Sequence, residues 1–120
     1  MNNLVVGITG FNGFVGKNLL LAFAAVAGDK ITPVGIPRNN LGLISQVKPH
    51  IIVHLAASIR GTEEELISGN EGFTVAILDE VEKVGTVKKF FFLSTIQEHS
   101  DSCYGVAKKR ARIVAESRCK

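Results

Sequence analysis

The stretch LVVGITGFNGFVG, residues 4–16, decides the fold of this 120-residue chain. Its first half, Leu4–Thr9, is a short apolar run of the kind that forms a buried strand. Glycines follow at positions 10, 13 and 16, and a segment of helical length then runs to Ala27, before Gly28 and Asp29. The loop predicts a phosphate site, because glycines allow close backbone approach and the following helix directs free N–H groups at the ligand. A structural turn without a ligand is the alternative, since GxxGxxG differs from the commoner GxGxxG fingerprint.

Short apolar runs alternate with helical segments along the rest of the chain. Strands are expected at Ile31–Ile36, His50–Ala56 and Lys89–Thr95, and helices at Leu41–Val47, at Asn70–Val84 and from Ser102 or Cys103 onward, with a further helix start at the acidic residues 62–65. Pro33 cannot donate a ladder hydrogen bond, so its strand is expected at or near a sheet edge. The alternation predicts one α/β domain over residues 1–120, a Rossmann-like doubly wound parallel sheet that is incomplete, with about four strands.

The composition is that of an ordinary globular domain, with 46% apolar and 21% charged residues. Two cysteines, Cys103 and Cys119, are too few for a disulfide framework and favour a reducing compartment. A signal peptide is the alternative interpretation of the apolar residues 19–27, but residues 1–16 carry no charge where a leader would be basic. The same run is too short to span a bilayer, so no membrane association and a cytoplasmic location are expected.

Charge is unevenly distributed along the chain. The net charge is +3 overall, but −3 up to Glu82 and +6 from Lys83 onward, which favours an anionic ligand at the basic end. The run KKRAR at residues 108–112 has no interleaved aromatic residues, so a solvated helix face is expected there rather than a nucleic-acid site. His50, His54 and His99 lack the spacing of metal ligands, and no metal is expected.

The end of the second predicted strand bears on the choice of dinucleotide. An acidic residue there would bind the 2′-hydroxyl of an adenosine ribose, as in NAD sites. Residues 35–39 read Gly-Ile-Pro-Arg-Asn and contain no acid. Arg38 is expected to pair instead with a 2′-phosphate, which favours NADP. NAD is the alternative cofactor, and a solvated loop arginine is the alternative role.

Tyr104 and Lys108 are four residues apart on a predicted helix and therefore share a face. A phenol has a pKa near 10, and a nearby ammonium lowers that pKa toward the neutral range where proton transfer is useful. Ser94 and Thr95 end the fourth predicted strand, where a hydroxyl can hold a substrate carbonyl. Together these residues predict an acid–base site, with a surface helix pair as the alternative.

Taken in order, these motifs resemble the extended short-chain dehydrogenase/reductases, which include the NAD-dependent epimerase/dehydratase proteins that act on nucleotide sugars. The resemblance rests on TGxxGxxG at residues 9–16, on His54-Leu55-Ala56-Ala57, on Ser94-Thr95 and on Tyr104-x-x-x-Lys108. It implies a cofactor site made of Gly10, Asn12, Gly13, Phe14, Val15, Gly16, Arg38, Leu55, Ala56, Ala57, Tyr104 and Lys108. It implies catalysis by Tyr104 as the acid or base, with Lys108 on the nicotinamide ribose, and Thr95, with Ser94 as its fallback, as the substrate-orienting hydroxyl.

A narrower resemblance is to the capsular-polysaccharide UDP-sugar 4-ketoreductases, carried by Gly69-Asn70, Leu78-Asp79, Ser94-Thr95-Ile96-Gln97 and Tyr104-Gly105. It implies NADPH-dependent reduction of a 4-keto UDP-sugar in surface-polysaccharide biosynthesis. Family members continue into a C-terminal substrate-binding portion, which this chain is expected to lack after Lys120. Two other functions therefore stay open: a nucleotide-sensing module, and a truncated, catalytically incompetent dinucleotide-binding fragment.

The fourth predicted strand presents an apolar edge that contains Phe90, Phe91 and Phe92. Such an edge invites pairing with another chain. We expect self-association, as a homodimer or otherwise, through this edge or through the helices Asn70–Val84 and Cys103–Arg118. The family resemblance points to the same helices, through which its members often dimerise.

Overall fold

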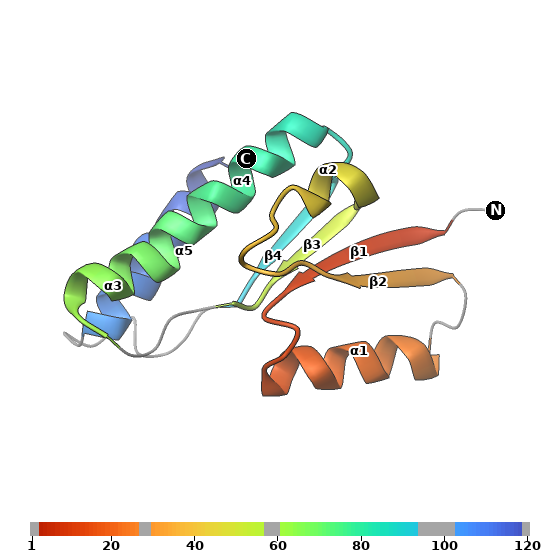
Figure 1. The fold of residues 1–120 in the computed structure, drawn as a ribbon, viewed down its shortest axis with the longest axis horizontal. Helices are drawn as coiled ribbons and strands as arrows, with labels where there is room; N and C mark the ends of the chain where they lie inside the picture. The colour runs from red at the N-terminus through yellow and green to blue at the C-terminus, as the bar shows by residue number, and fades with distance from the viewer. Residues whose placement is uncertain (1–2, 27–29, 57–60, 94–102, 119–120) are drawn as a thin grey trace. The chain divides into compact units, whose positions relative to one another are not determined.

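The structure, a computed structural model, describes residues 3–26, 30–56, 61–93 and 103–118. The chain forms two compact units (Figure 1). The first consists of Met1–Ala56 and Glu80–Phe91, and the second of Ala57–Asp79 and Phe92–Lys120.

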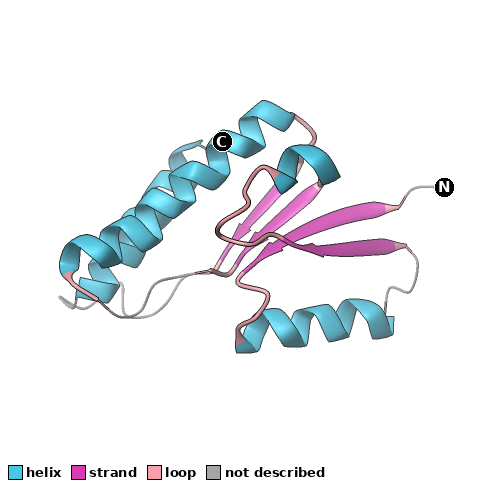
Figure 2. Ribbon diagram, in the orientation of Figure 1, coloured by secondary structure: helices cyan, strands magenta, loops and turns pink. Residues whose placement is uncertain are grey.

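Among the described residues, the sheet of the first unit has the order β2-β1-β3-β4 (Figure 2). Its strands are β1 (Leu4–Thr9), β2 (Ile31–Gly35), β3 (Ile51–His54) and β4 (Lys89–Phe92), the last residue of which is counted with the second unit. β1 pairs in parallel with β2 and with β3, and its register places Thr9 beside His54. β2 lies at the edge, as Pro33 predicts. The expected parallel Rossmann-like sheet of about four strands is confirmed.

Helices α1 (Phe14–Val26) and α2 (Leu43–Val47) lie on opposite sides of this sheet (Figure 1). The apolar core of the first unit consists of Val6, Ile8, Ile36, Ile44 and Ile52, none more than 2% exposed. Burying each such side chain contributes roughly 1.5–3 kcal/mol, so the apolar runs of the sequence account for the sheet. β1 and β3 thereby become fixed supports for the loops that follow them.

Apart from the end of β4, the described part of the second unit consists mainly of helices. It contains α3 (Glu63–Ile67), the wider turn η1 (Ser68–Gly72), the first half of α4 (Phe73–Val84) and α5 (Cys103–Arg118). α3 begins with a capping box, in which the Thr62 hydroxyl accepts from the Glu65 N–H and the Glu65 carboxylate accepts from the Thr62 N–H. These hydrogen bonds hold the pKa of Glu65 below its usual value. Helical structure thus begins at Glu63, where the acidic stretch at residues 62–65 predicts a helix start, and it continues through η1 into the helix expected from Asn70.

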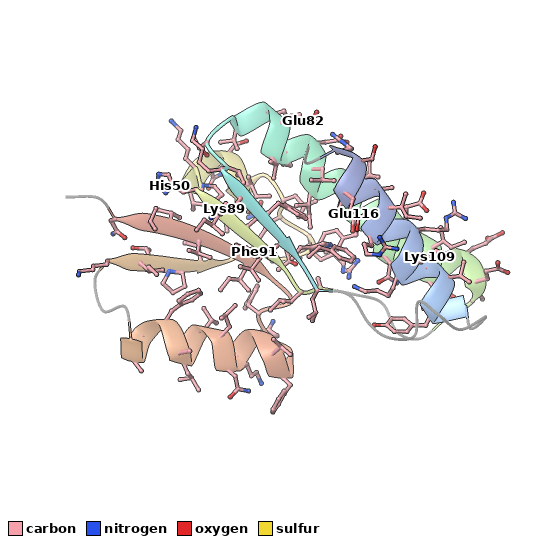
Figure 3. All side chains as sticks on the ribbon, turned by 180° about the vertical axis from the view of Figure 1, so that it is seen from behind. His50, Glu82, Lys89, Phe91, Lys109 and Glu116 are labelled. Atoms are coloured by element: carbon pink, nitrogen blue, oxygen red, sulfur yellow. The ribbon has the colours of Figure 1, made fainter. Side chains whose placement is uncertain are left out.

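Small residues allow α5 to pack closely in the second unit. Ala107, Ala111 and Ala115 follow one another at intervals of four, and none is more than 4% exposed. The polar residues Lys109 and Glu116 lie on the exposed part of the same helix, as Figure 3 shows. α5 therefore has one face in the core and one in solvent.

Two ion pairs add to this packing. Arg110 contacts Glu71 of η1 at 2.5 Å, and Arg118 contacts Asp79 of α4 at 3.0 Å. The pairing with Glu71 raises the pKa of Arg110. Exposed pairs of this kind contribute little stability, because water and salt screen the two charges. No helix within the described ranges is long and apolar enough to cross a membrane.

Candidate functional site

The glycine loop joins the buried end of β1 to the start of α1. Gly10 has φ +68°, a conformation that favours glycine, and its carbonyl accepts from the Gly13 N–H at 3.0 Å. The Gly13 carbonyl then accepts from the Lys17 N–H at 2.9 Å, so Gly13 stands at the N-cap position of α1. The loop predicted from the sequence is therefore a tight turn that leads directly into a helix N-terminus.

Two of the three glycines are required by crowding within the protein. A Cβ at Gly16 would lie 2.3 Å from the Gly10 carbonyl oxygen and 2.6 Å from the Phe11 Cα. A Cβ at Gly10 would lie 2.7 Å from the Ala56 backbone nitrogen. These are backbone atoms that cannot move aside, so Gly16 brings the helix close to the loop and Gly10 brings the loop close to the end of β3.

Gly13 differs from the other two glycines. A Cβ there would meet only the Gly10 carbonyl oxygen, at 3.4 Å, which is close to ordinary van der Waals contact. Crowding within the described residues therefore does not require a glycine at this position. An open backbone surface at a helix N-terminus is what a dinucleotide pyrophosphate requires, because the phosphates approach the main chain directly. The loop residues fit a dinucleotide on this observation.

The ends of β1 and β3 are joined by a buried hydroxyl. Thr9 is fully buried and His54 is 2% exposed, and the Thr9 Oγ1 lies 2.6 Å from the His54 Nδ1. The backbone N–H groups of Leu55 and Ala56 also donate to this oxygen, at 3.0 and 3.1 Å. The structure thereby brings two of the predicted cofactor residues, Leu55 and Ala56, against the glycine loop. Ala57 lies outside the described residues.

Phe11 connects the glycine loop to the end of β2, and Arg38 lies three residues beyond that strand. Three atoms of the Phe11 ring would all lie 2.8–2.9 Å from a Cβ built on Gly35, so the ring lies flat on this glycine at the end of β2. Phe11 was not predicted as a site residue, and its only signal in the sequence is an aromatic residue inside a glycine loop. Arg38 follows on an exposed loop, and partial burial of its guanidinium lowers the pKa of Arg38 from its usual value. An arginine stays charged in proteins, so it remains a candidate ligand for a phosphate.

In the second unit, Tyr104 and Lys108 lie on α5, as expected. Lys108 is only 3% exposed, and its Nζ lies 4.5 Å from the centroid of the Phe92 ring, a cation–π distance. Tyr104 is partly buried, and this burial raises its pKa. The lowering expected from Lys108 is therefore not what this structure gives, because desolvation penalises the phenolate. Ser94 and Thr95, the predicted substrate-orienting hydroxyls, lie outside the described residues.

Asn70 is a polar residue of the second unit, and its burial was not predicted from the sequence. It is 2% exposed, within the wider turn η1, where its Nδ2 donates to the Leu66 carbonyl at 2.8 Å. The backbone carbonyl of Asn70 accepts a hydrogen bond from the Thr74 hydroxyl at 2.7 Å. Wider turns inside helices are frequent at functional sites. The signal in the sequence was a Gly-Asn pair within a helical stretch. No group of three or more His, Cys, Asp or Glu in the described part of the chain is arranged to hold a metal.

The chain is similar to several known proteins in sequence and in fold. No protein-family profile matches the chain. A UDP-2-acetamido-2,6-beta-L-arabino-hexul-4-ose reductase from Pseudomonas aeruginosa is 32% identical over 107 residues, which cover 87% of this chain and 28% of the reductase. The chain thus spans less than a third of the length of this relative.

Solved structures show the same fold. A UDP-glucuronic acid 4-epimerase from Bacillus cereus, in complex with NAD, matches with a TM-score of 0.80 and 18% identity, over 96% of this chain and 52% of the epimerase. The capsular polysaccharide assembling protein CapF from Staphylococcus aureus matches with a TM-score of 0.75 and 27% identity, over 98% of this chain and 32% of CapF. A reductase named RMD from P. aeruginosa, complexed with NADPH, matches with a TM-score of 0.76 and 20% identity, over 93% of this chain and 47% of RMD.

The epimerase was solved with NAD and RMD with NADPH, and the chain matches between about a third and a half of the length of each of these three structures. The resemblance of the sequence motifs to the NAD-dependent epimerase/dehydratase proteins is therefore confirmed: the chain has their Rossmann-like fold and sequence similarity to a UDP-sugar 4-ketoreductase.

Proposed function

We propose that the chain binds NADP(H) and provides the dinucleotide-binding part of an enzyme that reduces a 4-keto UDP-sugar for surface-polysaccharide biosynthesis. The observation that carries the dinucleotide is the open backbone at Gly13, between two glycines that the fold itself requires. The reductase activity rests on the 32% identity to a UDP-hexul-4-ose reductase.

The glycine loop, Arg38 and the end of β3 would hold the cofactor. The backbone of Gly13 and the N-terminus of α1 suit the pyrophosphate, and Arg38 suits the 2′-phosphate that distinguishes NADP from NAD. Leu55 and Ala56 offer an apolar wall that the Thr9 hydroxyl holds in place. The bound cofactor supplies the hydride that reduces the keto carbon.

Tyr104 donates the proton that the ketone oxygen needs when its carbon receives the hydride. A phenol whose pKa is raised by burial keeps this proton at neutral pH, which suits a donor. Lys108 serves the cofactor ribose and compensates the phenolate that is left behind. Thr95, or Ser94 in its place, orients the carbonyl by a hydrogen bond. The product, a sugar nucleotide with a 4-hydroxyl group, is then released.

Calorimetric titration of the chain with NADP(H) and with NAD(H) tests the binding part of this proposal. We expect saturable binding with preference for NADP(H), and Arg38→Ala should remove the preference. Single-turnover oxidation of NADPH in the presence of a 4-keto UDP-sugar tests the chemical part. Absence of dinucleotide binding would contradict the proposed function.

A dinucleotide-sensing module without turnover is the second candidate. The glycine loop and the ends of β1 and β3 support it, because they suit a dinucleotide whether or not a sugar is reduced. Binding of NADP(H) without oxidation of NADPH by any 4-keto sugar nucleotide would select this second function.

A further inference from the structure

The Thr9 hydroxyl oxygen has three hydrogen-bonding neighbours, and only one arrangement of protons satisfies all of them. A hydroxyl oxygen has two lone pairs and one hydrogen. The N–H groups of Leu55 and Ala56 can only donate, at 3.0 and 3.1 Å, and they occupy both lone pairs. The hydroxyl hydrogen is left for the His54 Nδ1, 2.6 Å away. This nitrogen must accept, so it carries no proton.

We propose that His54 is a positioning residue: a neutral imidazole, protonated on Nε2, whose Nδ1 accepts the Thr9 proton and thereby turns the Thr9 oxygen toward the backbone of Leu55 and Ala56. A proton on Nδ1 would face an oxygen that has no lone pair left. The ring is buried and lies at a centroid distance of 6.0 Å from the Phe90 ring, which limits its rotation. The tautomer is therefore set by the strand ends themselves.

This arrangement matters because of what the Thr9 oxygen holds. Ala56 is the residue whose backbone nitrogen would lie 2.7 Å from a Cβ on Gly10, so its amide marks the closest approach of β3 to the glycine loop. Holding the Leu55 and Ala56 amides in place therefore sets the distance between the end of β3 and the glycine loop. His54 thus acts on the loop through Thr9 without touching a ligand. Its influence on dinucleotide affinity rests on the proposed function, whereas its tautomer does not.

Nitrogen-15 NMR of the histidine rings tests the tautomer in the intact chain. A His54→Asn variant assigns the His54 signals against those of His50 and His99. We expect the wild-type protein to show an unprotonated Nδ1 and a protonated Nε2 on His54 at neutral pH. Thr9→Ser keeps the hydroxyl and should keep this pattern, while Thr9→Val has nearly the same shape and should lose it. A protonated Nδ1 in the wild-type protein would overturn the proposal, even if Thr9→Val does not fold.

Titration with NADP(H) tests the positioning. Thr9→Val should weaken binding by about fivefold or more, because two part-buried amides lose their acceptor, and Thr9→Ser should restore binding to within about twofold. Thr32→Val is the matched control, since it makes the same change at an exposed hydroxyl of β2. If Thr9→Val binds like Thr32→Val, His54 and Thr9 do not position the loop. If the wild-type protein binds no dinucleotide, the proposed function fails while the NMR result still decides the hydrogen bond.

Discussion

Replacing each of two loop glycines by alanine separates the glycine that the fold needs from the one that a ligand needs. In Gly16→Ala the new Cβ would lie 2.3 Å from the Gly10 carbonyl oxygen and 2.6 Å from the Phe11 Cα. Real Cβ atoms do not approach backbone atoms so closely, so the loop must move. In Gly13→Ala the nearest atom is 3.4 Å away, and nothing needs to move.

The expected magnitudes follow from these distances. Overpacking a rigid site costs about 1–3 kcal/mol, and for a chain of this size each kcal/mol lowers the melting temperature by roughly 4 °C. Gly16→Ala should therefore melt about 4–12 °C lower. In Gly13→Ala, the weaker N-cap costs up to about 1 kcal/mol, and the more restricted unfolded chain returns about 0.4–1 kcal/mol. Its stability should change little.

Gly13→Ala, which should change stability little, should nevertheless lower dinucleotide affinity strongly. A methyl group at Gly13 occupies the surface that the pyrophosphate needs, so NADP(H) binding should weaken at least tenfold, about 1.4 kcal/mol. Gly42→Ala is a matched control, because Gly42 is also a helix N-cap with open space around it, beside α2. Calorimetric melting and titration of the three variants give both quantities. Wild-type affinity in Gly13→Ala, or equal stability of Gly13→Ala and Gly16→Ala, would refute this reading of the loop.

Three further predictions concern the chemistry, the cofactor and the assembly. Tyr104→Phe should leave cofactor affinity unchanged and slow single-turnover NADPH oxidation by about 10²–10⁴-fold. Lys108→Met should reduce both the affinity and the rate. Full turnover in Tyr104→Phe would show that Tyr104 is not the proton donor. Arg38→Ala should cost NADP(H) about tenfold or more in affinity and leave NAD(H) unchanged, and equal losses for both would contradict a 2′-phosphate role. Phe91, 53% exposed on β4 (Figure 3), should drive self-association at the sheet edge, so Phe91→Lys should shift sedimentation toward monomer; a wild-type monomer would contradict this.

The fold could be predicted where local sequence decides it. Apolar runs give the strands, Pro33 places β2 at the edge, and the glycine spacing gives the loop, because each depends on a few neighbouring residues. The helix that runs through Asn70 could not be predicted as well. Gly69 and Gly72 weaken a helical pattern locally, while the structure continues through them in the wider turn η1. The Asn70 side chain supports this turn by a hydrogen bond to Leu66, which the pattern of apolar residues does not encode.

The residues of the candidate site could be predicted from the sequence, but their burial and their contacts could not. Spacing alone places Tyr104 and Lys108 on one helix face. It does not show that Lys108 is almost fully buried, with its ammonium over the Phe92 ring, because that contact depends on how α5 packs beside a distant strand residue. The hydrogen bonds of the Thr9 hydroxyl likewise join residues that are 45 to 47 positions apart. Such contacts arise from tertiary packing.

The raised pKa of Tyr104 gives the proposed reaction a direction that a pH profile can test. Burial disfavours the phenolate, so the pKa of this phenol lies above its usual value near 10 and Tyr104 keeps its proton across the neutral range. Reduction of a ketone needs this protonated form, so its single-turnover rate should stay level from about pH 6 to 9 and fall only at more alkaline pH. Oxidation of the corresponding alcohol needs the phenolate and should rise with pH over the same interval. The contrary result is a reduction rate that falls between pH 6 and 8 in the wild-type protein but not in Lys108→Met. It would mean that the Lys108 ammonium lowers the pKa of Tyr104 when substrate and cofactor are bound. The direction inferred from burial would then be wrong.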